Sequence, residues 1–363
     1  MPNANRFGDL RRSTLSWCRR TRFSVSNAAR DLNSPIKMHQ INLQRSLIGS
    51  EYQPIRSRSQ RVWVCGRDKG AGTSVMIYLQ IAANGFVLGG LYACIAVGFS
   101  LVWGVLNVIN ILHGTFIVLG SYIAYFAYVH AGIHPFISVV IAGGVLYALG
   151  HAIHVGIINR VIAAPVLITL TLTFGLDLIL NNAMLVAFTA NYRSINLAHP
   201  LGTLEIGPVF LPGDRVAAMA LALFLTVLLW RLLRDSRIGR AIVAVRMDRE
   251  AAALMGVDVK RINAITFGIG ALMAGAAGAL LSIIFPISPL NSGSFLGKAF
   301  VVCVLGGLGS VPGAIVGGIV LGIIESFGAF WFGPEHAVTI SFAILLLLLF
   351  ARPRGLVGRR GYE

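Results

Sequence analysis

Charge is scarce in this chain of 363 residues: only 12% of them are Asp, Glu, Lys or Arg, whereas 56% are hydrophobic and the mean hydropathy is +0.76. A soluble domain cannot bury that much apolar surface. Cysteine is also rare, and its spacing matches no metal-binding motif, since the four positions are Cys18, Cys65, Cys94 and Cys303. We therefore expect neither a disulfide framework nor a metal site.

Motifs for phosphate binding and for zinc-dependent hydrolysis are missing. Gly297-Lys298 is followed by alanine without the surrounding GxxxxGK[ST] pattern, and the glycine-rich run 306–309 has no strand before it. No HExxH motif occurs. We expect a non-catalytic chain with no cofactor of its own. A membrane-embedded enzyme stays an alternative, because a few titratable side chains lie in apolar runs: His113, His151, His154 and Asp177.

Long apolar runs fill the chain from Met76 to Phe350. Several approach the ~20 residues that a helix needs to cross a bilayer core of ~30 Å, and they lack the alternation of barrel strands. The sequence predicts an all-α, polytopic transmembrane helical bundle with about 8–10 spans. We place the spans roughly at 78–102, 111–130, 136–158, 166–188, 214–233, 262–285, 295–327 and 336–351.

Two of these regions should be interrupted. The span at 295–327 is too long for one simple crossing and contains Pro312, so we expect it to be broken within 306–314. The segment 103–114 is expected to be re-entrant, because Asn107, Asn110 and His113 are poor partners for lipid.

Basic residues are concentrated in the head of the chain: residues 1–75 hold 14 Lys or Arg and 4 Asp or Glu. We interpret 1–75 as a basic, disordered N-terminal extension, with Met76 as the start of the working protein. A basic arm that binds an anionic surface is the alternative. The transmembrane domain is then expected over 76–358, followed by a short tail at 359–363.

A charged stretch between two apolar runs predicts a short helix at 248–258. Asp248 and Glu250 lie near its start and Lys260 beyond its end, which suits the helix dipole, and Gly256 is a plausible stop. Because Lys and Arg are dense over 231–261 and in the tail, the positive-inside rule makes both cytoplasmic. A polar helix in a mainly hydrophobic protein indicates a docking site for a soluble partner. The alternative is that this segment is an ordinary cytoplasmic loop.

Charged and small residues inside the spans carry a weaker signal. Asp177 and Glu325 are costly in lipid and should face the bundle interior. Glu325 has two possible roles: it forms a hydrogen bond between helices, or it lies on a substrate path. Glycine and alanine at four-residue spacing, as in Gly270, Ala274 and Gly278, favour close helix packing, with a backbone-lined permeation path as the alternative for some.

Several motifs occur in the order typical of one family. The stretch Glu250-Ala251-Ala252-x-x-x-Gly256 is similar to the EAA-x3-G coupling motif of ABC importer permeases. The body from 80 to 358 resembles the branched-chain amino acid permease subunit of such importers. The matching pieces are Asn84-Gly85, Ile109-Asn110 with His113-Gly114, Ser236-Arg237-x-Gly239-Arg240-Ala241, Lys298-Ala299-Phe300, Leu305-Gly306-Gly307-x-Gly309-Ser310-x-Pro312-Gly313-Ala314, Glu325 and Pro353-x-Gly355-Leu356.

This resemblance implies an importer of branched-chain or hydrophobic amino acids in a bacterial inner membrane, working by alternating access. Its partners would be two ABC ATPase subunits that use ATP and Mg, a second related permease subunit or a second copy of this chain, and a periplasmic substrate-binding protein, with no nucleic acid. Urea or short amides are alternative substrates, and a stand-alone channel or carrier is an alternative mechanism.

The resemblance also implies roles for particular residues. Those coupled to the ATPase would be Arg240, Asp248, Glu250, Ala251, Ala252 and Gly256. Those near the translocation path would be Asn84, Asn110, His113, Gly114, Gly306, Gly307, Gly309 and Glu325.

Overall fold

The computed structural model describes residues 72–351 apart from 162–163, 196, 198–200, 208 and 334–335. The expected extension at 1–75, except its last four residues, and the tail at 359–363 lie outside the described residues. The predictions for both, including Met76 as a start, stay predictions.

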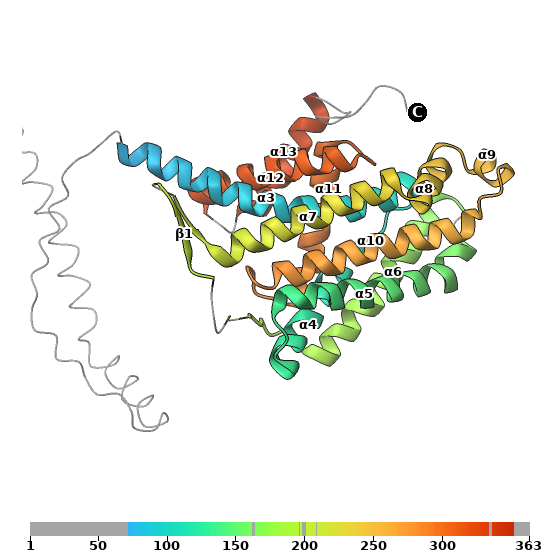
Figure 1. The fold of residues 1–363 in the computed structure, drawn as a ribbon, viewed down its shortest axis with the longest axis horizontal. Coiled ribbons are helices and arrows are strands. Elements are labelled where there is room, and N and C mark those ends of the chain that lie inside the picture. The colour runs from blue at the N-terminus through green and yellow to red at the C-terminus, as the bar shows by residue number, and fades with distance from the viewer. Residues whose placement is uncertain are drawn as a thin grey trace, which may run out of the picture. The chain divides into compact units, whose positions relative to one another are not determined.

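Long helices make up nearly all of the described chain, which confirms the all-α, polytopic bundle (Figure 1). They are α3 (Gly72–Leu106), α4 (Leu112–Ala131), α5 (Pro135–Gly156), α6 (Val166–Phe188), α7 (Gly213–Asp235), α10 (Val259–Leu281), α11 (Ser292–Gly306), α12 (Val311–Phe332) and α13 (Ala337–Ala351). Within the described ranges, eight helices are long and apolar enough to cross a membrane.

Shorter elements connect the long helices. They are the 3-10 turns η1 (Ile158–Arg160) and η2 (Pro289–Asn291), the helices α8 (Arg237–Met247) and α9 (Arg249–Leu254), and the strands β1 (Thr203–Ile206) and β2 (Val209–Pro212). The strands pair antiparallel, with Thr203 opposite Pro212. The sequence analysis predicted neither this hairpin, whose strands have only four residues each, nor α8, although the alternation of arginine with apolar residues in Arg237–Met247 is a usable helical signal.

Both expected interruptions are present. The long span splits into α11 and α12, as predicted, and the break falls at 307–310. The segment 103–114 contains a second break, because α3 ends at Leu106 and α4 begins at Leu112, while its re-entrant path in the membrane stays a prediction. The short helix expected over 248–258 is shorter than predicted: α9 ends at Leu254, since Gly256 takes a φ of 81° that ends the helix.

The core lies between α3 and α10, whose most apolar windows are 89% and 83% buried, whereas that of α6 is only 11% buried. Small residues let α3 approach α12 closely and let α10 approach α4 closely. A Cβ on Gly322 would lie 2.4 Å from the carbonyl oxygen of Gly85, and one on Gly278 would lie 1.9 Å from that of Ile117. These contacts confirm the packing interpretation of the glycine spacing.

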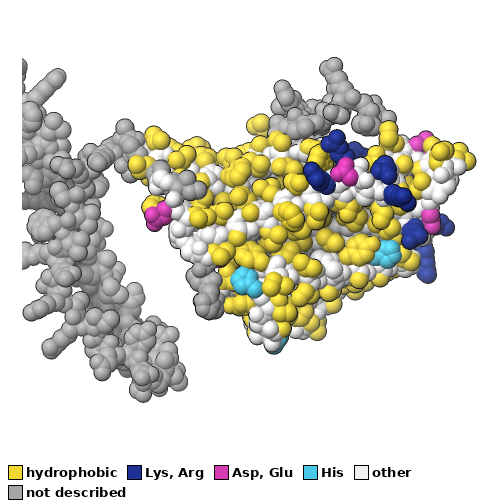
Figure 2. Space-filling model, viewed as in Figure 1, with side chains coloured by type: hydrophobic (Ala, Val, Ile, Leu, Met, Phe, Trp, Pro, Cys, Tyr) yellow, Lys and Arg dark blue, Asp and Glu magenta, His cyan; other side chains and the backbone are white. Residues whose placement is uncertain are grey.

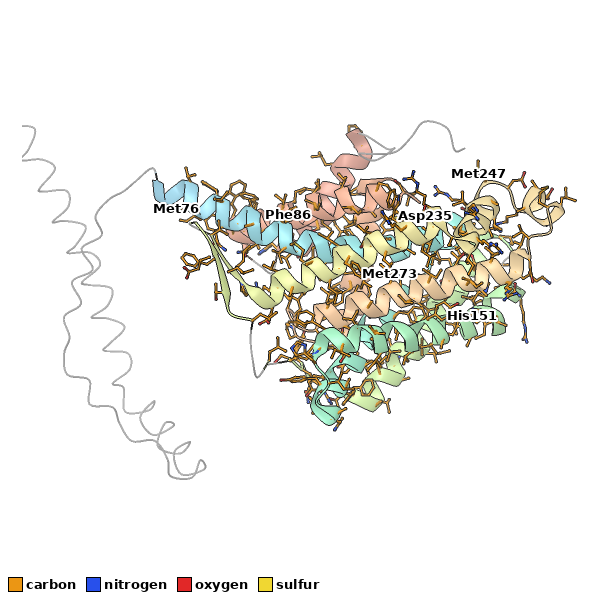
Figure 3. All side chains as sticks on the ribbon, in the orientation of Figure 1. Met76, Phe86, His151, Asp235, Met247 and Met273 are labelled. Atoms are coloured by element: carbon orange, nitrogen blue, oxygen red, sulfur yellow. The ribbon has the colours of Figure 1, made fainter. Side chains whose placement is uncertain are left out.

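The two ends of the bundle differ in chemistry. The β-hairpin lies at one end of the long helices and α8 and α9 lie at the other (Figure 1). Lys and Arg side chains gather over the α8–α9 end, while the flank between the ends is mainly hydrophobic, with histidine among the apolar side chains (Figure 2). Met76 lies toward the hairpin end, and Asp235 and Met247 toward the opposite end (Figure 3).

Candidate functional site

Helix α9 is a short, capped helix at the polar end of the bundle. The Oδ1 atom of Asp248 accepts hydrogen bonds from the backbone N–H groups of Glu250, at 2.8 Å, and Ala251, at 3.0 Å. These bonds satisfy donors that a helix start leaves free. Gly256 has open space where a Cβ would lie but a left-handed backbone, so its conformation rather than crowding favours glycine. The predicted start and stop signals of this helix are confirmed.

One side of α9 is anchored and another is open. The side chain of Ala252 is buried, whereas Glu250 and Ala251 are exposed. At its end, Leu254 is 88% exposed and Met255 is 84% exposed. These two large apolar side chains lie on a polar segment that projects beyond the long helices. Such an exposed apolar surface suits a protein partner.

Helix α8 connects α7 to α9 and is fixed to the bundle. Ser236 Oγ accepts the N–H of Gly239 at 2.8 Å, and Ile242 and Val245 are buried. Arg240 donates to the carbonyl oxygen of Asp235 at 3.1 Å. Among the predicted coupling residues, Arg240 therefore makes a contact within its own loop rather than with α9.

Two arginines that sequence reasoning did not assign to the site reach the two helix breaks. Arg249 Nη2 donates to the carbonyl oxygens of Leu106, at 2.6 Å, and Val105, at 3.2 Å, at the end of α3. Arg246 Nη1 donates to the carbonyl oxygen of Gly309 at 2.8 Å. Backbone acceptors have no sequence signature, so only the density of arginine in this loop hinted at the contacts.

Glycine shapes the break between α11 and α12. Gly307 and Gly309 have φ values of 96° and 77°, which other residues rarely adopt. A Cβ on Gly306 would lie 2.2 Å from the carbonyl oxygen of Gly313, so the two helix ends touch through their backbones. Ser310 Oγ then accepts the N–H of Gly313 at 3.1 Å and caps α12.

The break between α3 and α4 is made without glycine. Asn107 itself takes a φ of 55°. Asn110 is 1% exposed, and neither of its side-chain polar atoms has a hydrogen-bond partner. His113 Nε2 lies 2.9 Å from the carbonyl oxygen of Ile95, while its Nδ1 is unpaired. Gly114 packs against α11, since a Cβ there would lie 2.3 Å from the carbonyl oxygen of Ser292.

A buried ion pair occupies the interior of the bundle. Lys298 Nζ on α11 lies 2.6 Å from Glu325 Oε1 on α12 and donates to the hydroxyl of Tyr92 on α3 at 2.8 Å. Glu325 therefore faces the interior and bonds between helices, as one interpretation of the sequence proposed. Its part in a substrate path stays a prediction. Sequence reasoning did not give Lys298 this role, although a lone lysine in an apolar run was a usable signal.

Asn84, which was also predicted to lie near the translocation path, does not take part in the contacts described above. Asn84 Oδ1 accepts from Gln80 Nε2 at 3.4 Å, near the point where Gln80 also bonds Phe210 of β2. The structure thus distributes the predicted path residues over the hairpin side, the interior and the two breaks. It brings Gly309 to the loop that carries α9, and it leaves Asn84 elsewhere.

Titratable side chains of the enzyme alternative are scattered. Asp177 accepts a hydrogen bond from Thr115, and His154 is buried with both ring nitrogens unpaired. Across the described residues, no group of three or more His, Cys, Asp or Glu is placed to hold a metal ion. Cys94 and Cys303 are buried free thiols, while Cys18 and Cys65 lie outside the described residues.

Comparison with known proteins gives a consistent picture. Residues 81–350 match the family model described as branched-chain amino acid transport system / permease component. The chain is 33% identical to the high-affinity branched-chain amino acid transport system permease protein BraD of Pseudomonas aeruginosa, over 79% of this chain and 97% of BraD.

It is 34% identical to the corresponding protein LivH of Escherichia coli, over 79% of this chain and 98% of LivH. The permease protein LivM of the same organism is 33% identical over 40% of this chain and 35% of LivM. The family model covers most of the transmembrane bundle, including α9 and both helix breaks. The chain belongs to the family of permease components of branched-chain amino acid transport systems.

Proposed function

We propose that this chain is the membrane-spanning permease subunit of an ATP-driven importer for branched-chain amino acids. The observation that carries the proposal is the exposed apolar end of α9, on a polar loop whose neighbouring arginines contact both helix breaks. Such a loop can receive force from a soluble partner. The mostly apolar interior of the bundle suits a side chain such as that of leucine, isoleucine or valine.

The energy source lies in other subunits. The sequence contains no phosphate loop, which suits a chain that does not hydrolyse ATP unaided. We infer that ATP and Mg are used by two partner ABC ATPases and that this chain is a non-catalytic subunit. Nucleotide binding closes the ATPases, α9 moves with them, and the bundle opens to the opposite side of the membrane. Hydrolysis then resets it. Glu250, Ala251, Ala252 and Gly256 shape the docking helix, and Asp248 caps it.

A second permease subunit, related to this chain or identical to it, completes the membrane part. Helix α6 supports this, because it is almost uncovered and yet carries polar side chains, including the exposed Thr171 and Asn182. Both side chains donate to carbonyl oxygens of α6 itself, Thr171 to Leu167 and Asn182 to Leu178. The amide oxygen of Asn182 still suits a protein surface better than lipid. The partial similarity to LivM favours a related subunit. A periplasmic binding protein delivers the substrate.

The arginine distribution supports an inner-membrane topology with α8 and α9 in the cytoplasm. Arg231, Arg234, Arg237, Arg240, Arg246 and Arg249 all lie in or beside these two helices. Basic loops stay on the cytoplasmic side during insertion. The hairpin of β1 and β2 then faces the periplasm, where the binding protein approaches.

Reconstitution tests the proposal. Vesicles that contain the chain with its ATPases, second permease subunit and binding protein should accumulate radiolabelled leucine when ATP is supplied. Vesicles with this chain alone should not, and accumulation in them would favour a stand-alone carrier. Excess isoleucine or valine should compete with leucine, whereas competition by urea or acetamide but not by valine would overturn the substrate assignment.

Two substitutions in α9 and its stop test the docking helix. Gly256→Arg and Glu250→Lys should leave membrane insertion intact but abolish both leucine uptake and substrate-stimulated ATP turnover. Gly132→Arg is the matched control, since Gly132 has a φ of 64° and open space around it, as Gly256 does, but lies between α4 and α5. Normal uptake by both α9 variants would show that the coupling assignment is wrong.

A further inference from the structure

The last carbonyl groups of α3 are held by a side chain from another element. The end of a helix leaves backbone carbonyls without N–H partners, and the helix dipole makes this end negative. Arg249 of α9 places one guanidinium nitrogen on both Leu106 O and Val105 O. The side chain is half-buried, so the contact is fixed rather than free in solvent.

The turn between α11 and α12 is held from the same loop. Arg246, three residues earlier at the end of α8, donates to the carbonyl oxygen of Gly309. The turn also lies against α3, because a Cβ on Gly104 would be 2.9 Å from Gly309 Cα. A small cavity of about 30 Å³ lies beside this contact, with Leu101, Ile242 and Val311 in its wall. The arginines, not dense packing alone, therefore join these elements.

We propose that Arg246 and Arg249 are positioning residues that transmit motion of α9 to the two helix breaks. The proposal rests on the proposed function, because it needs an ATP-driven partner to move α9. When the partner displaces α9, Arg249 carries the end of α3 with it, and Arg246 carries the α11–α12 turn. The two breaks then move together, because the same short loop holds both.

Arginine suits this contact better than lysine does. A guanidinium presents several N–H donors in a fixed plane, so one group can serve two carbonyl oxygens, whereas an ammonium group is a compact point charge. Both residues also contribute to the positive-inside signal. Lysine keeps that signal and the charge, so an Arg→Lys change separates transmission of motion from membrane topology.

The experiment uses the complete reconstituted complex. Arg249→Gln, Arg249→Lys and Arg246→Gln are compared with wild type, with Arg261→Gln as the matched control. Arg261 is exposed at the start of α10, beside the same loop. Three quantities are measured for each: leucine uptake per assembled complex, ATP hydrolysis stimulated by loaded binding protein, and the amount of ATPase that co-purifies.

We expect Arg249→Gln to lower uptake per ATP hydrolysed by about tenfold, within the range typical of a lost coupling between sites, while ATPase co-purification stays normal. Arg249→Lys should retain an intermediate ratio and the wild-type topology, and Arg261→Gln should match wild type.

Equal uptake per ATP in wild type and Arg249→Gln would overturn the inference. So would a fall of uptake and hydrolysis in strict proportion to the amount of folded complex, for both Arg249 variants, because that is the signature of a purely structural role. If the wild-type complex itself shows no ATP-dependent uptake, the proposed function fails, which is distinguishable from failure of the arginine linkage.

Discussion

Lys298 and Arg249 both place a positive charge against oxygen atoms inside the protein, but the acceptors differ. Lys298 meets the Glu325 carboxylate and the Tyr92 hydroxyl deep in the bundle. Arg249 meets two backbone carbonyls at the end of a helix, near the polar surface. The first contact joins three helices that are already packed together, and the second joins a projecting loop to the end of α3. We infer that the first mainly stabilises the bundle and the second mainly links moving parts.

The largest effect on stability should come from breaking the interior pair. Lys298→Met leaves the Glu325 carboxylate buried without its cation, which costs about 3–5 kcal/mol. The free energy of unfolding in detergent, measured by chemical denaturation, should fall by this amount. The double variant Lys298→Met/Glu325→Leu should recover most of the loss, since it removes both charges. A single variant as stable as wild type would show that the pair contributes little to the bundle.

A smaller loss should follow from adding a methyl group at the arginine-linked turn. Gly309→Ala introduces a left-handed non-glycine residue, which costs about 1–2 kcal/mol. Its Cβ would also lie 2.9 Å from Arg246 Nη2, so the Arg246 contact must shift and leucine uptake should fall. Gly132→Ala carries the same backbone cost in open space and should retain uptake. Similar uptake by the two variants would contradict a role for this turn in transport.

The smallest change in stability, with a large change in transport, should follow from removing the cap of α9. Asp248→Ala loses two cap hydrogen bonds, which is worth about 1 kcal/mol, but only to a six-residue helix. Asp258→Ala is the matched control, because Asp258 caps α10 by accepting the N–H of Arg261 at 3.1 Å. The two variants should have similar melting temperatures in thermal unfolding, whereas leucine uptake should fall only for Asp248→Ala. Loss of uptake in both would mean that any disturbance of the loop suffices.

The sequence predicted the parts of the fold that depend on local chemistry. Apolar runs located the spans within several residues, Pro312 and the surrounding glycines located the break before α12, and Asp248 and Gly256 marked the start and stop of α9. Each of these signals acts over a few residues, so a single sequence is enough to read it.

Contacts between distant segments could not be predicted, because the signals in a single sequence act over only a few residues. Lys298 and Tyr92 are 206 positions apart, and Arg249 and Leu106 are 143 apart. The second contact ends on a backbone oxygen, which every residue possesses, so no side-chain pattern could identify it. The hairpin between α6 and α7 was missed because its strands have only four residues each. The cost of a carboxylate in lipid predicted that Glu325 and Asp177 face other helices, but it did not predict their partners.

The length of α3 has a mechanical consequence. Its 35 residues form a rod of about 50 Å, against a hydrocarbon core of ~30 Å. Arg249 binds the carbonyl oxygen of Leu106 at one end of this helix. Gln80, near the other end, forms hydrogen bonds with both the N–H and the C=O of Phe210 in the hairpin. Between these two contacts, close glycine packing against α12 resists bending of α3. We therefore expect a displacement of Leu106 by α9 to reach the hairpin through α3.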